Sequence, residues 1–214
     1  LFLFDRNYIE YHGDRFIDVS LVAYMDDLPV AVFPVAMGAG DKEAVSHPGL
    51  TFGGVVFIHD IRGNAAIAVI EAFLDYLHEL GVGVLTVKLL PQVFAGYPSA
   101  ELDYVLWRRG FSLVRRDLSS LLPLRNPIPF NTSKRQSIGK AVKAGLAIAS
   151  ASAAEFHELL TDVLNRQHGV RPVHSSDDMD LLMRRFPGMI DIYAAKLDGR
   201  LLAGAMVYKY NHIW

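Results

Sequence analysis

Cysteine is absent from the 214 residues of this sequence. Its absence excludes a disulfide framework, a thiolate metal site and a cysteine nucleophile. The sequence also lacks a run of about 18 apolar residues and a charged-then-apolar signal pattern, so it predicts neither a transmembrane helix nor export. These absences lead us to expect a cytoplasmic protein.

An excess of positive charge is also missing. Lysine and arginine number 21 against 23 aspartates and glutamates, which gives a net charge near −2. This balance argues against nucleic-acid binding through a broad basic face, although a local basic patch stays open. With 51% hydrophobic residues, the chain has the composition of an ordinary globular protein of one or two domains.

The most distinctive stretch is Ser-His-Pro-Gly-Leu-Thr-Phe-Gly-Gly at 46–54, which runs into a β-branched and aromatic segment. Pro48 fixes φ, while Gly49, Gly53 and Gly54 permit positive φ or a close approach to the main chain. This composition predicts a shaped surface loop. A tight strand-to-strand turn with a bulge is the simpler alternative.

Hydrophobic periodicity predicts an α/β protein. The clearest helix covers 63–80, because apolar residues recur there at spacings of three and four and Gly81 follows. A short amphipathic helix is expected within 1–18, and 123–133 has the proline content of a linker. Residues 25–28 and 198–200 have the composition of hairpin turns. The other predicted helices are 100–109, 134–144, 153–166 and 177–186, and the predicted strands are 19–24, 29–35, 44–46, 52–57, 82–89, 111–121, 147–150, 189–197 and 201–208.

Three motifs in this order resemble a known family. They are the loop at 46–54, Pro-Ser-Ala-Glu-Leu-Asp-Tyr-Val-Leu at 98–106 and Arg-Gln-Ser-Ile-Gly-Lys-Ala at 135–141. Together they resemble the FemAB-like branch of the GNAT acyltransferases, which is related to the Fem-type aminoacyltransferases that build peptidoglycan cross-bridges. The resemblance covers the chain from Phe4 to about Val207.

The resemblance implies a tandem GNAT fold, a mixed sheet flanked by helices in each unit. The implied limits are a first domain at 1–125, a linker at 126–133 and the N-terminal part of a second domain at 134–214. Because the second unit would then lack its pyrophosphate loop, we expect residues 1–214 alone to be inactive. Its unfinished edge would be covered by further chain or by a second copy, so a homo-oligomer is possible.

The implied activity is amide formation on an amino-sugar or peptide precursor of the cell envelope, with acetyl-CoA or another acyl-CoA as donor and no metal. The near-neutral charge favours this donor over a nucleic acid. One alternative is a Fem-type peptidyltransferase that uses aminoacyl-tRNA, which would make tRNA a partner. A non-catalytic binding module that retains the fold is another.

Amide formation needs a base, donors for an oxyanion and a positioned acceptor. His47 or Asp103 is the candidate base, Tyr104 a proton relay, and the Gly53 or Gly54 N–H an oxyanion or substrate contact. The remaining candidates bind substrate or phosphate: Ser46, Gly49, Thr51, Phe52, Arg135, Lys140 and His174. For each, a purely structural or solvent-exposed role is the alternative.

One departure from the family pattern concerns the acyl-CoA site. GNAT enzymes hold the pyrophosphate on backbone N–H groups at the start of the helix after the third strand. The corresponding segment here, 60–65, begins with Asp60, whose charge would repel phosphate. We therefore expect the first unit to shape an acceptor site and not to bind CoA in the ordinary way.

Overall fold

The computed structural model describes residues 1–10, 16–38, 42–58, 61–211 and 213. The chain forms two compact units, one made of Leu1 and Leu3–Arg116 and the other of Phe2 and Asp117–Trp214. We call them the first and second unit and describe each by itself. The predicted domain limits at 125 and 134 remain predictions.

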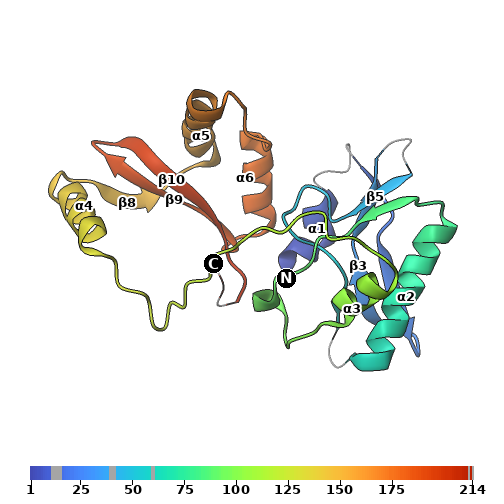
Figure 1. The fold of residues 1–214 in the computed structure, drawn as a ribbon. Coiled ribbons are helices and arrows are strands. Elements are labelled where there is room, and N and C mark those ends of the chain that lie inside the picture. The colour runs from blue at the N-terminus through green and yellow to red at the C-terminus, as the bar shows by residue number, and fades with distance from the viewer. Residues whose placement is uncertain (11–15, 39–41, 59–60, 212, 214) are drawn as a thin grey trace. The chain divides into compact units, whose positions relative to one another are not determined.

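In its described residues, the first unit contains two sheets and three α-helices. It runs from blue to green in Figure 1. One sheet has the order β1-β4-β5-β7 and is mixed, because β5 and β7 are parallel while its other pairs are antiparallel. The second sheet has the order β2-β3-β6 and is antiparallel. The elements are η1 (Phe2–Phe4), α1 (Arg6–Ile9), β1 (Ile17–Asp18), β2 (Leu21–Met25), β3 (Leu28–Phe33), β4 (Val35–Met37), β5 (Glu43–Ser46), β6 (Val56–Phe57), α2 (Gly63–Glu79), β7 (Val84–Thr86), η3 (Gln92–Phe94) and α3 (Glu101–Arg108).

The core of the first unit lies between α2 and the strands. Ile70 and Leu77 of α2 are each 1% exposed, and Phe33 of β3 is fully buried against Phe73 with ring centroids 5.8 Å apart. The periodic apolar face predicted for 63–80 is therefore the face that packs inwards. Leu80, at the end of that pattern, is exposed instead.

Charged side chains join α2 to α3. Glu71 accepts hydrogen bonds from both Arg108 and Arg109, and Arg109 also pairs with Asp75. An isolated helix of eight residues is marginal in water, so α3 depends on its neighbours for stability. These ion pairs and the buried Val105 attach it to α2.

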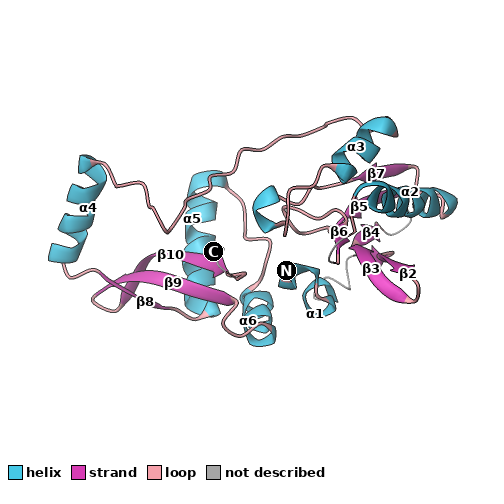
Figure 2. Ribbon diagram, turned by 90° about the horizontal axis from the view of Figure 1, so that it is seen from below, coloured by secondary structure: helices cyan, strands magenta, loops and turns pink. Residues whose placement is uncertain are grey.

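The second unit has one antiparallel sheet of order β10-β9-β8, with α5 and α6 packed on it (Figure 2). Gly204 of β10 lies beneath the Phe156 ring, and a Cβ at this position would be 3.0 Å from that ring. The elements are α4 (Thr132–Lys143), β8 (Ala147–Ser150), α5 (Ala153–His168), α6 (Ser176–Arg185), β9 (Ile190–Leu197) and β10 (Arg200–Tyr208).

Both predicted hairpins form. Asp26 and Asp27 between β2 and β3, and Asp198 and Gly199 between β9 and β10, all have positive φ, from 49° to 76°. Two consecutive residues of this kind make the turn whose twist matches that of the flanking strands. The sequence therefore identified both turns from their composition.

Several strand predictions were wrong or too long. No strand is assigned at 111–121, where the described chain has no regular secondary structure and Leu118 is fully exposed. A strand exists only beside a partner that accepts its hydrogen bonds, and no described strand lies beside this segment. Two other predicted strands are shorter in the structure: 82–89 contains only β7, and 52–57 contains only β6. The predicted strand at 29–35 is interrupted at Pro34, which separates β3 from β4.

The predicted helix within 1–18 is also shorter than expected. It divides into η1, the single turn of α1 and, after residues that lie outside the described chain, β1.

None of the helices that the structure describes combines the length and the hydrophobicity needed to cross a lipid bilayer.

Candidate functional site

The loop at 46–54 leaves β5 in a strained conformation. His47 has φ 53°, which is unusual for a residue with a side chain, and Gly49 and Gly54 have φ 80° and 86°. The N–H of Leu50 donates to the His47 carbonyl at 3.3 Å, which closes a tight turn. Gly53 is required for a different reason, because a Cβ there would lie 2.8 Å from the Cβ of His47.

One side of this loop forms the wall of a cavity of about 240 Å³ within the first unit. His47, Pro48 and Leu50 contribute to this wall from the loop. Most of the other lining residues are apolar, among them Tyr8, Ile9, Phe16, Val35 and Ala36.

Charged and polar side chains of the same cavity come from α1, β1 and the residues that follow β1. Arg6 forms ion pairs with Asp18 and, at 3.3 Å, with Glu10, and the Ser20 N–H donates to Asp18 at 2.9 Å. An apolar pocket with a few fixed polar groups is the usual form of a small-molecule site. We therefore take this cavity as the candidate functional site.

His47 is a buried residue of the site, with 2% of its surface exposed. Its ring stacks on Phe4 with centroids 5.0 Å apart, and its Nδ1 lies 3.3 Å from the Phe52 carbonyl oxygen. A base in this position reaches a ligand only through the cavity. Phe4 and the Phe52 carbonyl also hold the ring in place, which is a structural role for His47.

The other side of the loop contacts the chain after β7. The Lys88 N–H donates to Ser46 Oγ at 2.8 Å, its carbonyl accepts the Gly53 N–H at 3.0 Å, and its Nζ donates to the Leu50 carbonyl at 2.6 Å. Ser46 is fully buried by these contacts. Because the Gly53 N–H is donated to Lys88, it does not point at a substrate in this conformation.

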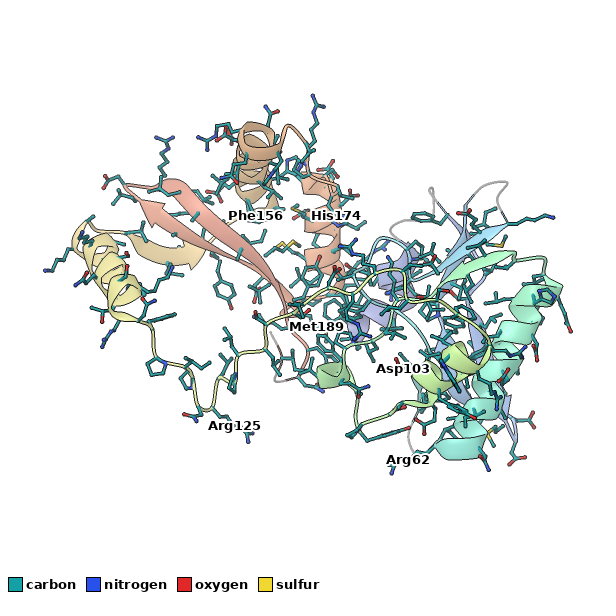
Figure 3. All side chains as sticks on the ribbon, viewed as in Figure 1. Arg62, Asp103, Arg125, Phe156, His174 and Met189 are labelled. Atoms are coloured by element: carbon teal, nitrogen blue, oxygen red, sulfur yellow. The ribbon has the colours of Figure 1, made fainter. Side chains whose placement is uncertain are left out.

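The remaining first-unit candidates do not line the cavity. Asp103 is exposed on α3 (Figure 3). Tyr104 on the same helix is also exposed, and its ring contacts Trp107 and lies under Arg108. Thr51 is exposed, and the Phe52 ring stacks on Phe94 at 5.1 Å. The structure thus brings His47 to the cavity and leaves Asp103 and Tyr104 on a solvent-exposed helix.

At the start of α2, the chain supplies its own anion. The Gly63 N–H donates to the Glu101 carboxylate at 2.9 Å, and Ser99 Oγ donates to the same group at 2.6 Å. The Ser99 hydroxyl and the Gly63 N–H together lower the pKa of Glu101 to about 2. A helix N-terminus is a general anion site, and the family resemblance predicted the altered pyrophosphate segment at this one. Asp60, from which we predicted repulsion, lies outside the described residues.

We expect Glu101→Gln to lower the free energy of unfolding by about 1 kcal/mol at pH 7, a value reduced for solvent screening. Because the pKa of Glu101 is lowered in the folded protein, the stabilisation is present above the ordinary value of 4.5 and is lost as pH falls through about 2. Urea unfolding at several pH values should show the two proteins converging below pH 4.5. Glu79→Gln, on the same helix pair, is the control; a gap of equal size in that variant would contradict the assignment.

Arg135, Lys140 and His174 belong to the second unit. Arg135 and Lys140 are exposed on α4, and His174 is half-buried ahead of α6 (Figure 3). Their predicted roles in binding substrate or phosphate remain predictions. Within the described residues, no three histidine, aspartate or glutamate side chains gather as a metal site.

Two residues of the first unit that hold the loop at 46–54 and the start of α2 were not predicted from the sequence. Lys88 is a single charge near the end of the apolar run 82–89, and that interruption was the available signal. Glu101 is one of the acids at the start of α3, and nothing in its neighbourhood along the chain indicates that it caps α2.

Comparisons with known proteins give a structural match. The crystal structure of FemX matches 90% of this chain and 52% of its own chain, with a TM-score of 0.51 and 16% sequence identity. This chain therefore spans about half the length of FemX. No family model matches the sequence, and no curated protein matches it.

At this identity, the match to FemX concerns the fold. The predicted resemblance to Fem-type proteins is confirmed at that level, as is the mixed α/β architecture with helices flanking a mixed sheet.

Proposed function

We propose that this chain is part of a Fem-type aminoacyltransferase, which joins an amino acid from aminoacyl-tRNA to an amine of a peptidoglycan precursor. The observation that carries this proposal is the likeness to the FemX fold over 90% of the chain. The order of the three motifs and the cavity behind the loop at 46–54 support it.

In this reaction, the acceptor amine attacks the ester carbonyl of the aminoacyl-tRNA. A carbon–nitrogen bond forms, the ester carbon–oxygen bond breaks, and the tRNA hydroxyl leaves with a proton that the amine has lost. The protein has to position the amine, receive its proton and donate to the oxyanion.

Three side chains remain candidates for the proton transfer: His47, Asp103 and Tyr104. His47 is the one that borders the cavity, so we place the acceptor there. Neither predicted oxyanion donor lies at this cavity, because the Gly53 N–H is bonded to the Lys88 carbonyl and Gly54 is not among the lining residues.

Two features favour a tRNA donor over acyl-CoA. Glu101 occupies the α2 N–H group that a pyrophosphate would use in the first unit. On the second unit, α4 presents Arg135, Lys140 and Lys143 to solvent, where they are free to contact phosphate. Acetyl-CoA, the donor favoured by the net charge of −2, is the second candidate.

We further propose that the two units are tandem GNAT-like domains, with residues 134–214 as the first part of the second. In support, this chain covers 52% of FemX and its second unit has a three-stranded sheet. On this proposal, residues 1–214 alone are inactive, and the site is completed by further chain or by a second copy.

The test is a transfer assay with the complete protein and, in parallel, residues 1–214. Each is incubated with a labelled donor, either charged tRNA or acetyl-CoA, and with peptide or amino-sugar precursors of the cell envelope. We expect label to pass from charged tRNA to a peptide precursor with the complete protein, and we expect none with residues 1–214.

Three outcomes would contradict the proposal. Transfer from acetyl-CoA alone would establish the acyl-CoA enzyme. Tight precursor binding without turnover would indicate a binding module. Turnover by residues 1–214 would refute the incomplete second domain.

A further inference from the structure

A single residue holds the loop at 46–54 from the β7 side. Lys88 bonds Ser46 through its N–H, Gly53 through its carbonyl and Leu50 through its ammonium group. Its three hydrogen bonds therefore span the loop from the first residue to the eighth. The bond to Leu50 is the one that depends on the side chain of Lys88.

The conformation that Lys88 holds would not persist without support. His47, with φ 53°, is in the left-handed region, which costs a residue with a Cβ about 1–2 kcal/mol. Such conformations persist where surrounding contacts determine them, and they concentrate at functional sites. His47 and Leu50 are both wall residues of the cavity, so the contact to Leu50 bears directly on the cavity's shape.

Using the ammonium group of Lys88 to hold a carbonyl costs free energy, because a charge is partly withdrawn from water. Lys88 is half-buried, and this burial lowers the pKa of its side chain below the usual range. Among the described residues, no carboxylate forms an ion pair with it. A methionine has similar length and would fill the same space without withdrawing a charge from water.

We infer that Lys88 is a positioning residue of the cavity: its ammonium group fixes the Leu50 carbonyl, and thereby the left-handed His47 and the wall formed by Pro48 and Leu50. The fold would be as stable with an apolar residue at 88. The lysine is therefore present for the shape of the loop, and this holds whichever acceptor or donor the protein uses.

The test compares two variants of Lys88 with a control variant, all in residues 1–214. Lys88→Met keeps the length and removes the charged donor, while Lys88→Arg retains one. Lys42→Met removes an exposed lysine of the same unit. Hydrogen exchange is followed at the amides of His47, Leu50 and Gly53, whose acceptors are backbone carbonyls that every variant keeps.

We expect Lys88→Met to speed exchange at these three amides by about tenfold or more, since hydrogen bonds of charged groups are among the stronger ones. The urea midpoint should stay unchanged or rise, because the buried charge has gone. Lys88→Arg should restore much of the protection, and Lys42→Met should change neither measurement.

Two results would overturn the inference. If the three amides of Lys88→Met exchange as in the original protein, Lys88 does not position the loop. If the midpoint falls, or the variant does not fold, while amides throughout the first unit exchange faster, Lys88 is an ordinary stabilising residue. Because the assay reads the loop directly, its failure leaves the proposed reaction untouched.

Discussion

Replacing Gly54 with alanine should lower the free energy of unfolding by about 2 to 5 kcal/mol. Two costs add: an alanine at φ 86° loses about 1–2 kcal/mol, and the crowding of its Cβ adds about 1–3 kcal/mol. That Cβ would lie 3.1 Å from the Lys88 carbonyl oxygen and 3.3 Å from Leu102 Cδ2. Urea unfolding followed by circular dichroism measures the loss.

Gly81 provides a matched control for Gly54. It has the same φ of 86°, yet a Cβ there would meet nothing within 4 Å. Gly81→Ala should therefore lose only the conformational part, about 1–2 kcal/mol. Equal losses at the two positions would show that the loop yields freely and that its close packing against Lys88 does not constrain it.

The second large effect is expected in the core. Leu77→Ala should lower the free energy of unfolding by about 2–5 kcal/mol, because Leu77 is 1% exposed and its truncation leaves a cavity in a packed interior. Chemical denaturation of the purified chain measures this change.

Leu80→Ala is the control on the same helix pattern. Leu80 lies one turn later and is 48% exposed, so its truncation should change stability by no more than about 0.5 kcal/mol. A similar loss at both positions would mean that the apolar face of α2 extends further than the structure places it.

These two leucines illustrate how far sequence reasoning reaches. A period of 3.6 residues identified α2 and the residues on its inner face, since helical periodicity depends on the chain's own geometry. Where the helix leaves the core depends on its neighbours, so Leu80 was assigned to the apolar face although it is exposed. The two hairpins were equally accessible, because their turns are local.

The features that the sequence did not predict depend on residues that are distant along the chain. The segment at 111–121 has strand composition, yet strand formation needs a neighbour that composition does not specify. Glu101 caps α2 from 38 residues away, and Lys88 reaches Leu50 from 38 residues away. Such contacts follow from the fold as a whole and not from any local pattern.

The parallel pairing of β5 with β7 has a consequence for the order of folding. Glu43 lies opposite Val84, so this pair forms only when the ends of a long crossover, which contains α2, have been brought together. Closing such a loop lowers the entropy of the chain before the contacts that offset this loss have formed. Helix α2 is a local structure and forms without that loss. The cavity wall belongs to the same crossover and is bonded to Lys88, shortly after β7. We therefore expect it to be among the last parts of the first unit to take its final shape.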